Sequence, residues 1–444
     1  MPHRPNILLI VADDHCHAAM SCATGPTQDP VRTPHLDALA DRGVRFTHAY
    51  HAGSSVGAVC MPSRAMLHGG TGPFNLPADM AHGVSAPYLG PPTVPTLGQR
   101  LRDAGYTAHH IGKWHNFEPA FERSFDTGEA VFHGGMPEDH FNTPMSRWDG
   151  KTHARQAMMN CHGTDVFAEA ARAFLHRRAD DDTAQPFFLS LAFTAPHDPR
   201  RTHPEYHARF PAERIDLPPS FTPNPEMRPD RLPIRDNLCI PLPRDPAAMR
   251  HEIAGYYAMV EHLDHGIGRV LDALSQTGLA DDTLVVYTAD HGHAVGQHGL
   301  LAKQTVYDHS TRVPLIVAGP GVARGAVRDQ LVYQHDTHPT LLTAAGLDAE
   351  GCAFDALTPL LTEAPADWPR QTIGSFYGDD LRMITDGRTK LVVEHHPQGT
   401  TRTAYDLAAD PWEMSPQDAS AGHPLDDALY AWQREHGDPL AAHA

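Results

Sequence analysis

The chain has 444 residues, of which 41% are hydrophobic, enough for a sizeable core and too many for a disordered chain. Its net charge of −19, with histidine neutral, argues against nucleic acid as the main partner. No stretch approaches the ~20 apolar residues of a membrane-spanning helix, so no membrane partner is expected. The six cysteines form no CxxC pair, and a chain of this length needs no disulfide framework.

The first apolar segment, residues 6–12 (NILLIVA), predicts a strand buried on both faces of a parallel sheet. This run is too short for the apolar region of a signal peptide, so a cytoplasmic location is expected. Asp13 and Asp14 follow the strand directly, where ligands gather in open α/β sheets. Two adjacent carboxylates there favour a cation. The alternative is an ordinary turn with a helix-capping aspartate.

A helix is predicted over residues 33–42, and residues 58–70 (AVCMPSRAMLHGG) then predict a second, short helix. Gly-rich residues precede Cys60, and Pro62 suits a first helical turn. Cys60 would therefore lie at a helix N-terminus, where free backbone N–H groups favour an anion. The alternative for a single cysteine is a small buried hydrophobe.

The next predicted elements are a helix over residues 96–104 and a strand over residues 106–111. This strand leads into Gly112-Lys113-Trp114-His115. On an extended segment the side chains of Lys113 and His115 point to the same side. The ordinary interpretation of such a pair is that both side chains are exposed to solvent. Residues 118–163 show no sustained period and are interpreted as an irregular insertion over the sheet edge.

An amphipathic helix is predicted over residues 164–178, with Thr164 or Asp165 as its N-cap. Another buried strand, residues 187–194, is followed by His197, which is either a turn histidine or a functional one at the same edge as Asp13 and Asp14. The proline-rich residues 199–246 predict a long loop that walls the cleft and sets substrate choice.

The last buried strand of this series, residues 283–288, follows a long helix predicted over residues 247–274 and ends in Asp290-His291. Lys303 follows, and a helix over 335–346 closes the main domain. Beyond about residue 365, short alternating strands (371–377, 381–385, 389–394) and a helix over 426–435 are predicted. We therefore expect an α/β fold with a large mixed, mostly parallel sheet sandwiched by helices over residues 1–365. Residues 366–444 would form a small C-terminal antiparallel α+β subdomain.

Three of the predicted strands end in ionisable groups: Asp13-Asp14, His197 and Asp290-His291. A parallel sheet brings these ends to one edge. Three crowded carboxylates repel one another unless a divalent cation neutralises them. Oxygen-rich ligation indicates Ca²⁺ or Mg²⁺, and the nitrogen of His291 leaves Mn²⁺ open.

The five residues Cys60-Met61-Pro62-Ser63-Arg64 resemble the active-site signature of the type I sulfatases, in the alkaline phosphatase superfamily. Gly112–His115, residues 288–321 and the ending Tyr405-Asp406-Leu407 resemble the same family. The resemblance implies an alkaline phosphatase-like fold and one metal ion, with Ca²⁺ as the first choice. It also implies that a formylglycine-generating enzyme converts Cys60 to formylglycine (3-oxoalanine). The expected metal ligands are Asp13, Asp14, Asp290, His291 and the modified residue 60.

The resemblance further implies a sulfuric ester hydrolase that releases sulfate from a small anionic sulfate monoester. Arg64, Lys113 and Lys303 would neutralise the sulfate oxygens. A hydroxyl of the formylglycine hydrate would attack sulfur, with His197 or Lys303 as the general acid for the leaving alcohol. His115 would then take the proton of the second hydroxyl and expel sulfate.

Three short segments depart from the family pattern. They are Gly69-Gly70 where Thr-Gly is common, Asn116-Phe117 after the lysine–histidine motif, and Glu413–Pro416, a difference that is expected to lie at the surface. The runner-up function is a phosphonate monoester hydrolase or phosphodiesterase on the same scaffold. A third interpretation is a metal-binding protein without catalysis, with Cys60 unmodified. The sequence names neither the alcohol that is released nor the oligomeric state.

Overall fold

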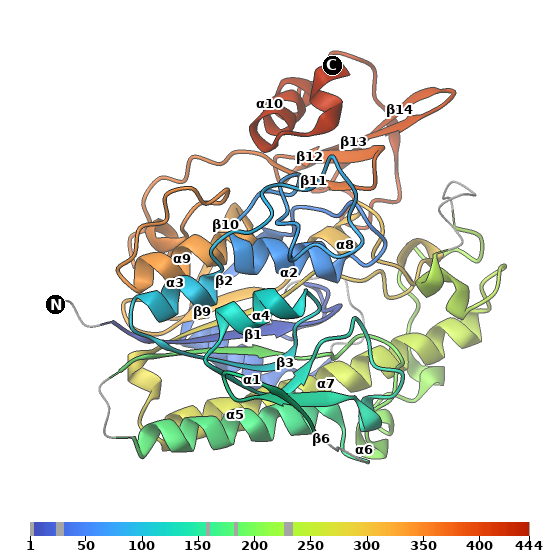
Figure 1. The fold of residues 1–444 in the computed structure, drawn as a ribbon. Helices are drawn as coiled ribbons and strands as arrows, with labels where there is room; N and C mark the ends of the chain where they lie inside the picture. The colour runs from blue at the N-terminus through green and yellow to red at the C-terminus, as the bar shows by residue number, and fades with distance from the viewer. Residues whose placement is uncertain (1–3, 24–30, 157–159, 182–184, 226–233, 444) are drawn as a thin grey trace.

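The computed structural model describes residues 4–23, 31–156, 160–181, 185–225 and 234–443. Its main body is a ten-stranded sheet between two layers of helices, and a second sheet of five strands lies beside it (Figure 1). The main sheet has the order β10-β2-β9-β8-β1-β7-β3-β4-β5-β6. Of these described strands only β9 and β5 run against the rest, so the sheet is mixed and mostly parallel, as predicted.

The centre of the sheet is formed by β8, β1 and β7, three largely apolar strands that are each buried along their whole length. Aliphatic side chains on both faces of these strands contact the helix layers, and this burial is the main stabilising term of such a fold. The strands are β1 (Asn6–Ala12), β2 (Gly43–Tyr50), β3 (Thr107–Lys113), β4 (Thr127–Phe132), β5 (Met145–Trp148), β6 (His153–Gln156), β7 (Phe187–Ala192), β8 (Thr283–Ala289), β9 (Leu315–Ala318) and β10 (Ala326–Tyr333).

Helices α1, α5 and α7 cover one face of the sheet, and α2, α3 and α9 cover the other (Figure 1). The longest, α7, begins where the carboxylate of Asp245 accepts the backbone N–H groups of Ala247 and Ala248. The helices are α1 (Pro34–Asp41), α2 (Cys60–Gly69), α3 (Leu97–Asp103), α4 (Glu118–Ser124), α5 (Gly163–Ala179), α6 (Pro204–His207), α7 (Pro246–Gln276), α8 (Asp308–Thr311), α9 (Thr337–Ala344) and α10 (Asp426–His436).

The second sheet is antiparallel and lies in the C-terminal part of the chain, with α10 against β11 and β12. Its strands are β11 (Ile373–Tyr377), β12 (Leu381–Thr385), β13 (Thr389–His396), β14 (Gly399–Asp406) and β15 (Gln417–Asp418). The buried hydroxyl of Tyr333 in β10 donates to the carbonyl of Gly374 in β11 at 2.7 Å and so joins the two sheets. We propose the boundary between residues 1–365 and 366–444 as the division between the two parts.

Four details differ from the sequence expectations. The described part of residues 118–163 is not an irregular insertion, because β4, β5 and β6 extend the main sheet there and α4 precedes them. Helix α5 is capped by the ring of His162, which accepts the N–H of Thr164, rather than by Thr164 or Asp165. Strands β2, β9 and β10 were not predicted, although the apolar run Leu315–Ala318 of β9 is a strand signal. Glu413 is not at the surface but buried.

The proline-rich segment 199–246 holds α6 and short 3-10 turns rather than long elements, and residues 226–233 of it lie outside the described part. The single-turn 3-10 helices are His140–Asn142, Ala212–Arg214, Arg235–Cys239, Ala280–Asp282, Gln297–Gly299, Gln334–Asp336, Thr358–Leu360 and Pro439–His443. Among the described residues no helix combines the length and apolarity that a membrane span requires.

Candidate active site

The carboxyl ends of four neighbouring strands bring the predicted site residues together. In the sheet order β8-β1-β7-β3, these strands lead into Asp290-His291, Asp13-Asp14, His197 and Lys113–His115 respectively. Backbone hydrogen bonds continue beyond the strands, from Asp290 N–H to the carbonyl of Ala12 and from Asp13 N–H to that of Ala195, both at 3.1 Å. The parallel register of the strands therefore sets the positions of the backbone atoms from which these side chains extend.

Cys60 is the first residue of α2 and is buried at the N-terminal end of that helix. Its Sγ lies 3.2 Å from Nδ1 of His115. Burial works to raise the pKa of the Cys60 thiol, but the nearby charges of Lys113, His115 and Lys303 outweigh it and hold this pKa well below its ordinary value. The position of residue 60 is therefore one at which the protein favours a negative group.

Each of the three site carboxylates has its own buried cation. Nζ of Lys113 lies 2.5 Å from Asp13 Oδ2, and Nζ of Lys303 lies 2.7 Å from Asp14 Oδ1. The third pair joins Nε of Arg64 to Asp290 Oδ2 at 2.9 Å. All six side chains are at most 3% exposed, so the charges act at low effective dielectric.

Arg64 also donates to the carbonyl of Lys113 at 3.0 Å. Its guanidinium thus orients both Asp290 and the end of β3. The hydroxyl of Ser63 donates to the carbonyl of Asp290 and ties α2 to β8. The Cys-x-Pro-Ser-Arg motif therefore places the nucleophile candidate and also braces the two strands that face it.

Four polar atoms of the predicted site residues are fully buried and have no hydrogen-bond partner among the described residues: Asp13 Oδ1, Asp14 Oδ2, His291 Nε2 and Arg64 Nη2. The first three can act as metal ligands. Nδ1 of His291 donates to the carbonyl of Gly292 at 2.9 Å, so Nε2 is the nitrogen that carries the lone pair when the ring is neutral. An imidazole held in this way by a backbone carbonyl is the usual arrangement of a metal-ligating histidine. The donor set fits a divalent cation.

The candidate ligands form two overlapping groups. One holds Asp13, Cys60, Asp290 and His291, with one ligand atom from each within 4.8 Å of the others. The second joins Asp13 and Asp14 with His197. The structure thus brings all five predicted metal ligands to one place, but Asp14 does not fall within the tighter group.

His197 lies between a carboxylate and an ammonium. Its Nδ1 is 3.0 Å from Asp198 Oδ1, and its Nε2 accepts from Nζ of Lys303 at 3.0 Å. Burial works to lower the pKa of Lys303, but Asp14 outweighs it and holds this pKa well above the ordinary value. Lys303 and His197 therefore form a connected pair through which a proton can pass.

The Lys113–His115 segment reaches the site in a different way from the one that the sequence indicated. Strand β3 ends at Lys113, and His115 adopts a left-handed backbone with φ of 54°. The prediction of an extended backbone from Lys113 to His115 is therefore wrong at His115, although both side chains reach the site. Gly112 is required here, because its φ is 94° and a Cβ would lie 1.9 Å from the carbonyl oxygen of Ala192. Asp14, with φ of 65°, is also left-handed.

The structure adds residues that the sequence reasoning missed. Asp198 orients His197 and is held in turn by Arg235, through contacts of 2.7 and 2.9 Å. The sequence signal available for Asp198 was its position next to His197. Gln304 donates to the carbonyl of Gly57 at 2.7 Å and so links the Lys303 segment to the loop before Cys60. Nothing in the sequence indicated that contact.

The family model described as Sulfatase matches residues 5–347. The chain belongs to the sulfatase family. The family predicted from the Cys60 motif is therefore confirmed, and the matched region contains every predicted site residue. A second model, described as N-sulphoglucosamine sulphohydrolase, C-terminal, matches residues 296–423.

Among sulfatase relatives, the chain is 30% identical over 336 residues to an ulvan-active sulfatase of Formosa agariphila, covering 72% of this chain and 57% of that protein. It is 30% identical over 348 residues to human iduronate 2-sulfatase, covering 71% of this chain and 60% of the relative. The chain thus spans less than two thirds of the length of these relatives.

Solved structures share the fold over nearly the whole chain. A structure in complex with its substrate D-glucosamine-2-N,6-O-disulfate has a TM-score of 0.77 at 23% identity, covering 98% of this chain and 99% of that one. The phosphonate monoester hydrolase of Agrobacterium radiobacter has a TM-score of 0.72 at 22% identity, covering 99% of this chain and 96% of that one. The predicted alkaline phosphatase-like α/β architecture is confirmed.

Proposed function

We propose that this member of the sulfatase family hydrolyses a sulfate monoester through a formylglycine made from Cys60. The observation that carries the proposal is the position of Cys60 at the start of α2, within reach of His115 and beside three buried cations. A helix N-terminus and buried cations together favour an anionic group such as a sulfate ester. Sulfatase activity of the relatives supports the same reaction.

The proposal includes one divalent cation, with Ca²⁺ as the first choice and Mg²⁺ or Mn²⁺ as alternatives. Asp13, Asp14, Asp290, His291 and residue 60 would hold it. A bound cation would draw negative charge away from the ester oxygens. A formylglycine-generating enzyme is the expected maturation partner, and the converted residue would supply a hydrated aldehyde whose second hydroxyl allows sulfate to be expelled.

The roles of the other side chains follow from their contacts. Lys113 and Lys303 contribute positive charge next to residue 60 and hold Asp13 and Asp14 in place. His115 is close enough to residue 60 to take a proton from it. The connected pair of His197 and Lys303 supplies the proton for the leaving alcohol, while Arg64 orients Asp290.

The test is a variant that retains a nucleophile but loses the second hydroxyl. Cys60→Ser should undergo at most one sulfation per chain, since no internal route releases the sulfate. The measurement is the amount of alcohol released per mole of protein from para-nitrophenyl sulfate. Cys161→Ser is the matched control, because Cys161 is an exposed free cysteine. Sustained turnover by Cys60→Ser would contradict the mechanism.

A phosphonate monoester hydrolase or phosphodiesterase is the second candidate, because phosphonate monoester hydrolases share the fold. Rates on para-nitrophenyl sulfate and on an aryl phosphodiester, measured on the same converted sample, separate the two. A higher kcat/KM for the sulfate supports the proposal, and a higher value for the phosphodiester supports the second candidate. Inactivity of fully converted protein on both esters would favour a metal-binding protein without catalysis.

A further inference from the structure

The proline-rich segment 199–246 brings one arginine against the His197 side of the site. Arg235 is the first residue of the 3-10 turn Arg235–Cys239. Its Nη1 and Nη2 lie 2.7 and 2.9 Å from the two carboxylate oxygens of Asp198. A planar guanidinium that holds both oxygens fixes the plane of the carboxylate. Since Oδ1 of this carboxylate lies 3.0 Å from Nδ1 of His197, Arg235 sets the position of a group that holds the His197 ring.

The carboxylate of Asp198 is a lasting negative charge beside this ring. Burial works to raise the pKa of Asp198, but the hydrogen bonds from Arg235 and His197 outweigh it and hold this pKa well below its ordinary value. Nδ1 of His197 also donates to the carbonyl of Asp198 at 2.9 Å, so Nε2 faces Lys303, whose Nζ lies 3.0 Å away. When a proton passes from Lys303 to Nε2, the carboxylate stabilises the imidazolium that forms.

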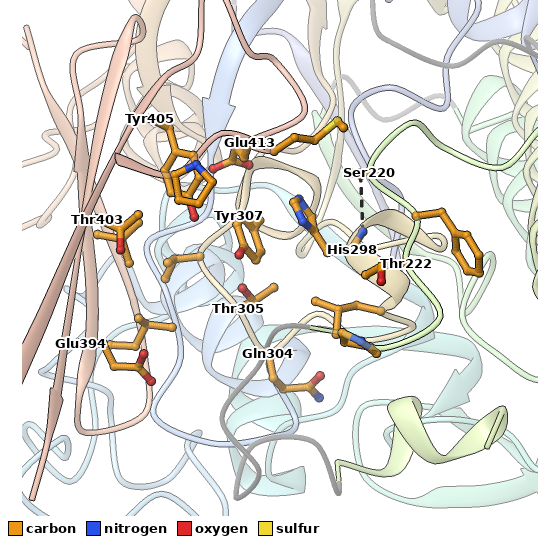
Figure 2. Close-up of a pocket in the computed structure, with 18 of the residues that line it drawn as sticks. Ser220, Thr222, His298, Gln304, Thr305, Tyr307, Glu394, Thr403, Tyr405 and Glu413 are labelled. Carbon is orange, nitrogen blue, oxygen red and sulfur yellow. Dashed lines mark hydrogen bonds between the residues drawn. The ribbon is translucent and has the colours of Figure 1, made fainter. Parts of the chain in front are cut away.

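A second set of contacts runs from Arg235 to the loop before Cys60. The guanidinium of Arg235 also lies 2.5 Å from Oδ1 of the buried Asp236. The other oxygen of Asp236 accepts the side-chain amide of Gln304 at 3.3 Å, and the same amide donates to the carbonyl of Gly57 at 2.7 Å. Figure 2 shows Gln304 at one end of a pocket that lies beside the second sheet. Arg235 is thus joined both to the proton-transfer pair and to the loop that leads to the nucleophile candidate.

The turn that carries Arg235 is itself anchored to the segment that carries Lys303. The buried side chain of Asn237 accepts the backbone N–H of Leu301 at 3.0 Å. The buried guanidinium of Arg244 donates to the carbonyl of Asn237 at 2.6 Å. These contacts fix the backbone of the turn, so the half-exposed side chain of Arg235 extends from a defined position.

We propose that Arg235 is a positioning residue for the proton transfer to the leaving alcohol, because it holds Asp198 and, through it, keeps His197 against Lys303. The inference rests on the proposed sulfatase function and gives the proline-rich segment a part in the departure of the alcohol. An alcohol that leaves readily as an anion needs little help from a general acid, whereas a poor leaving group depends on it. Loss of Arg235 should therefore slow esters of poor leaving groups most.

The first experiment compares phenyl sulfate with para-nitrophenyl sulfate, whose nitro group makes the released phenol a stronger acid. Arg235→Ala should lower kcat for phenyl sulfate about tenfold more than for para-nitrophenyl sulfate. Arg235→Lys should show a smaller difference, because it keeps the charge but loses the paired contact with the carboxylate. Equal losses on the two esters would assign Arg235 a purely structural role and overturn the proposal. A higher KM with unchanged kcat would assign it to substrate binding and would also overturn the proposal.

Two further variants test the path through Asp198. Arg209→Ala is the matched control, because Arg209 lies in the same segment, is also half-exposed and is 2.9 Å from the buried Glu261. It should not separate the two esters. Arg235→Ala/Asp198→Asn should separate them no more than Asp198→Asn alone, since Arg235 acts through Asp198. A double variant in which the two effects multiply would contradict this path and overturn the proposal.

A crystal structure of Arg235→Ala separates this inference from the proposed function, because it needs no turnover. Nε2 of His197 should lie beyond hydrogen-bond reach of Nζ of Lys303, more than about 3.5 Å away, whereas Arg209→Ala should keep the contact. If converted natural protein hydrolyses neither ester, the sulfatase proposal fails, and the crystal structure still tests the position of His197. An unchanged contact between His197 and Lys303 in Arg235→Ala would overturn the positioning role alone.

Discussion

Replacing Lys390 with methionine should destabilise the contact between the second sheet and the catalytic body. Lys390 lies in β13 and is fully buried. Its ammonium contacts Asp308 Oδ1 at 2.5 Å and Glu413 Oε1 at 2.6 Å, and it donates to the carbonyl of Val306 at 3.2 Å. Lys390→Met would leave two buried carboxylates without their shared cation.

The size of the loss in the free energy of unfolding follows from the number of charged groups that the variant leaves unpaired. Removing one partner of a buried ion pair costs about 3–5 kcal/mol. Two contacts remain in the variant: Arg312 lies 3.1 Å from Asp308, and the backbone N–H of Asp308 donates to Glu413 at 2.7 Å. We therefore expect a loss near the lower end, about 3 kcal/mol at about pH 8.

The loss should depend on pH because Glu413 is easily protonated. Burial raises its pKa to about 7, against the lowering effect of Lys390. Without Lys390 this pKa rises further, so at about pH 5.5 Glu413 is neutral and no longer needs a cation. The difference in the free energy of unfolding between the natural chain and Lys390→Met should therefore grow as pH rises from about 5.5 to about 8.

Urea unfolding followed by circular dichroism at both pH values measures this difference. Lys390→Met/Glu413→Gln should recover part of the loss, since it removes a charge together with its partner. Lys151→Met is the control at an exposed lysine. A loss below about 1 kcal/mol at both pH values, or a double variant that is no more stable than the single one, would refute the reasoning.

Three further outcomes are expected. Gly70→Ala should lower the free energy of unfolding by more than about 1 kcal/mol in thermal unfolding, because Gly70 has φ of 65° and a Cβ would lie 2.7 Å from Nε2 of His338. Burial raises the pKa of Asp264 to about 7, so the natural chain should lose stability as pH rises from about 4 to about 7, and Asp264→Asn should remove about 2–4 kcal/mol of that loss. His291→Ala should lower the content of divalent metal in dialysed protein, measured by inductively coupled plasma mass spectrometry. An unchanged unfolding curve, pH profile or metal content would contradict the corresponding expectation.

The centre of the fold was predictable because its strands carry continuous apolar runs. Residues 6–12, 187–192 and 283–289 lie side by side in the sheet, and their polar followers meet at one edge as expected. The outer strands were harder to predict. Strand β10 alternates between exposed and half-buried residues over its first half, and β5 and β6 have four residues each. Such short or mixed patterns do not differ from those of loops.

The same limit applies to the site. Strand ends and short motifs indicated ten site residues, and the structure brings the other nine to the same edge of the sheet as Cys60. The roles of Asp198 and Gln304 depend instead on contacts between segments far apart in the chain, such as the 2.7 Å bond from Gln304 to Gly57. Glu413 was expected at the surface, but it is buried beside Lys390. The two residues lie in different parts of the C-terminal chain, so the local sequence around Glu413 does not show the pairing. No local pattern encodes such a pair.

The central claim is that residue 60 works as an aldehyde hydrate and not as a thiol. The most direct measurement relates the specific activity on para-nitrophenyl sulfate to the fraction of chains converted, read from the mass spectrum of the peptide that contains residue 60. The account predicts activity proportional to the converted fraction and none in chains that retain the thiol. Full activity in unconverted protein would contradict it.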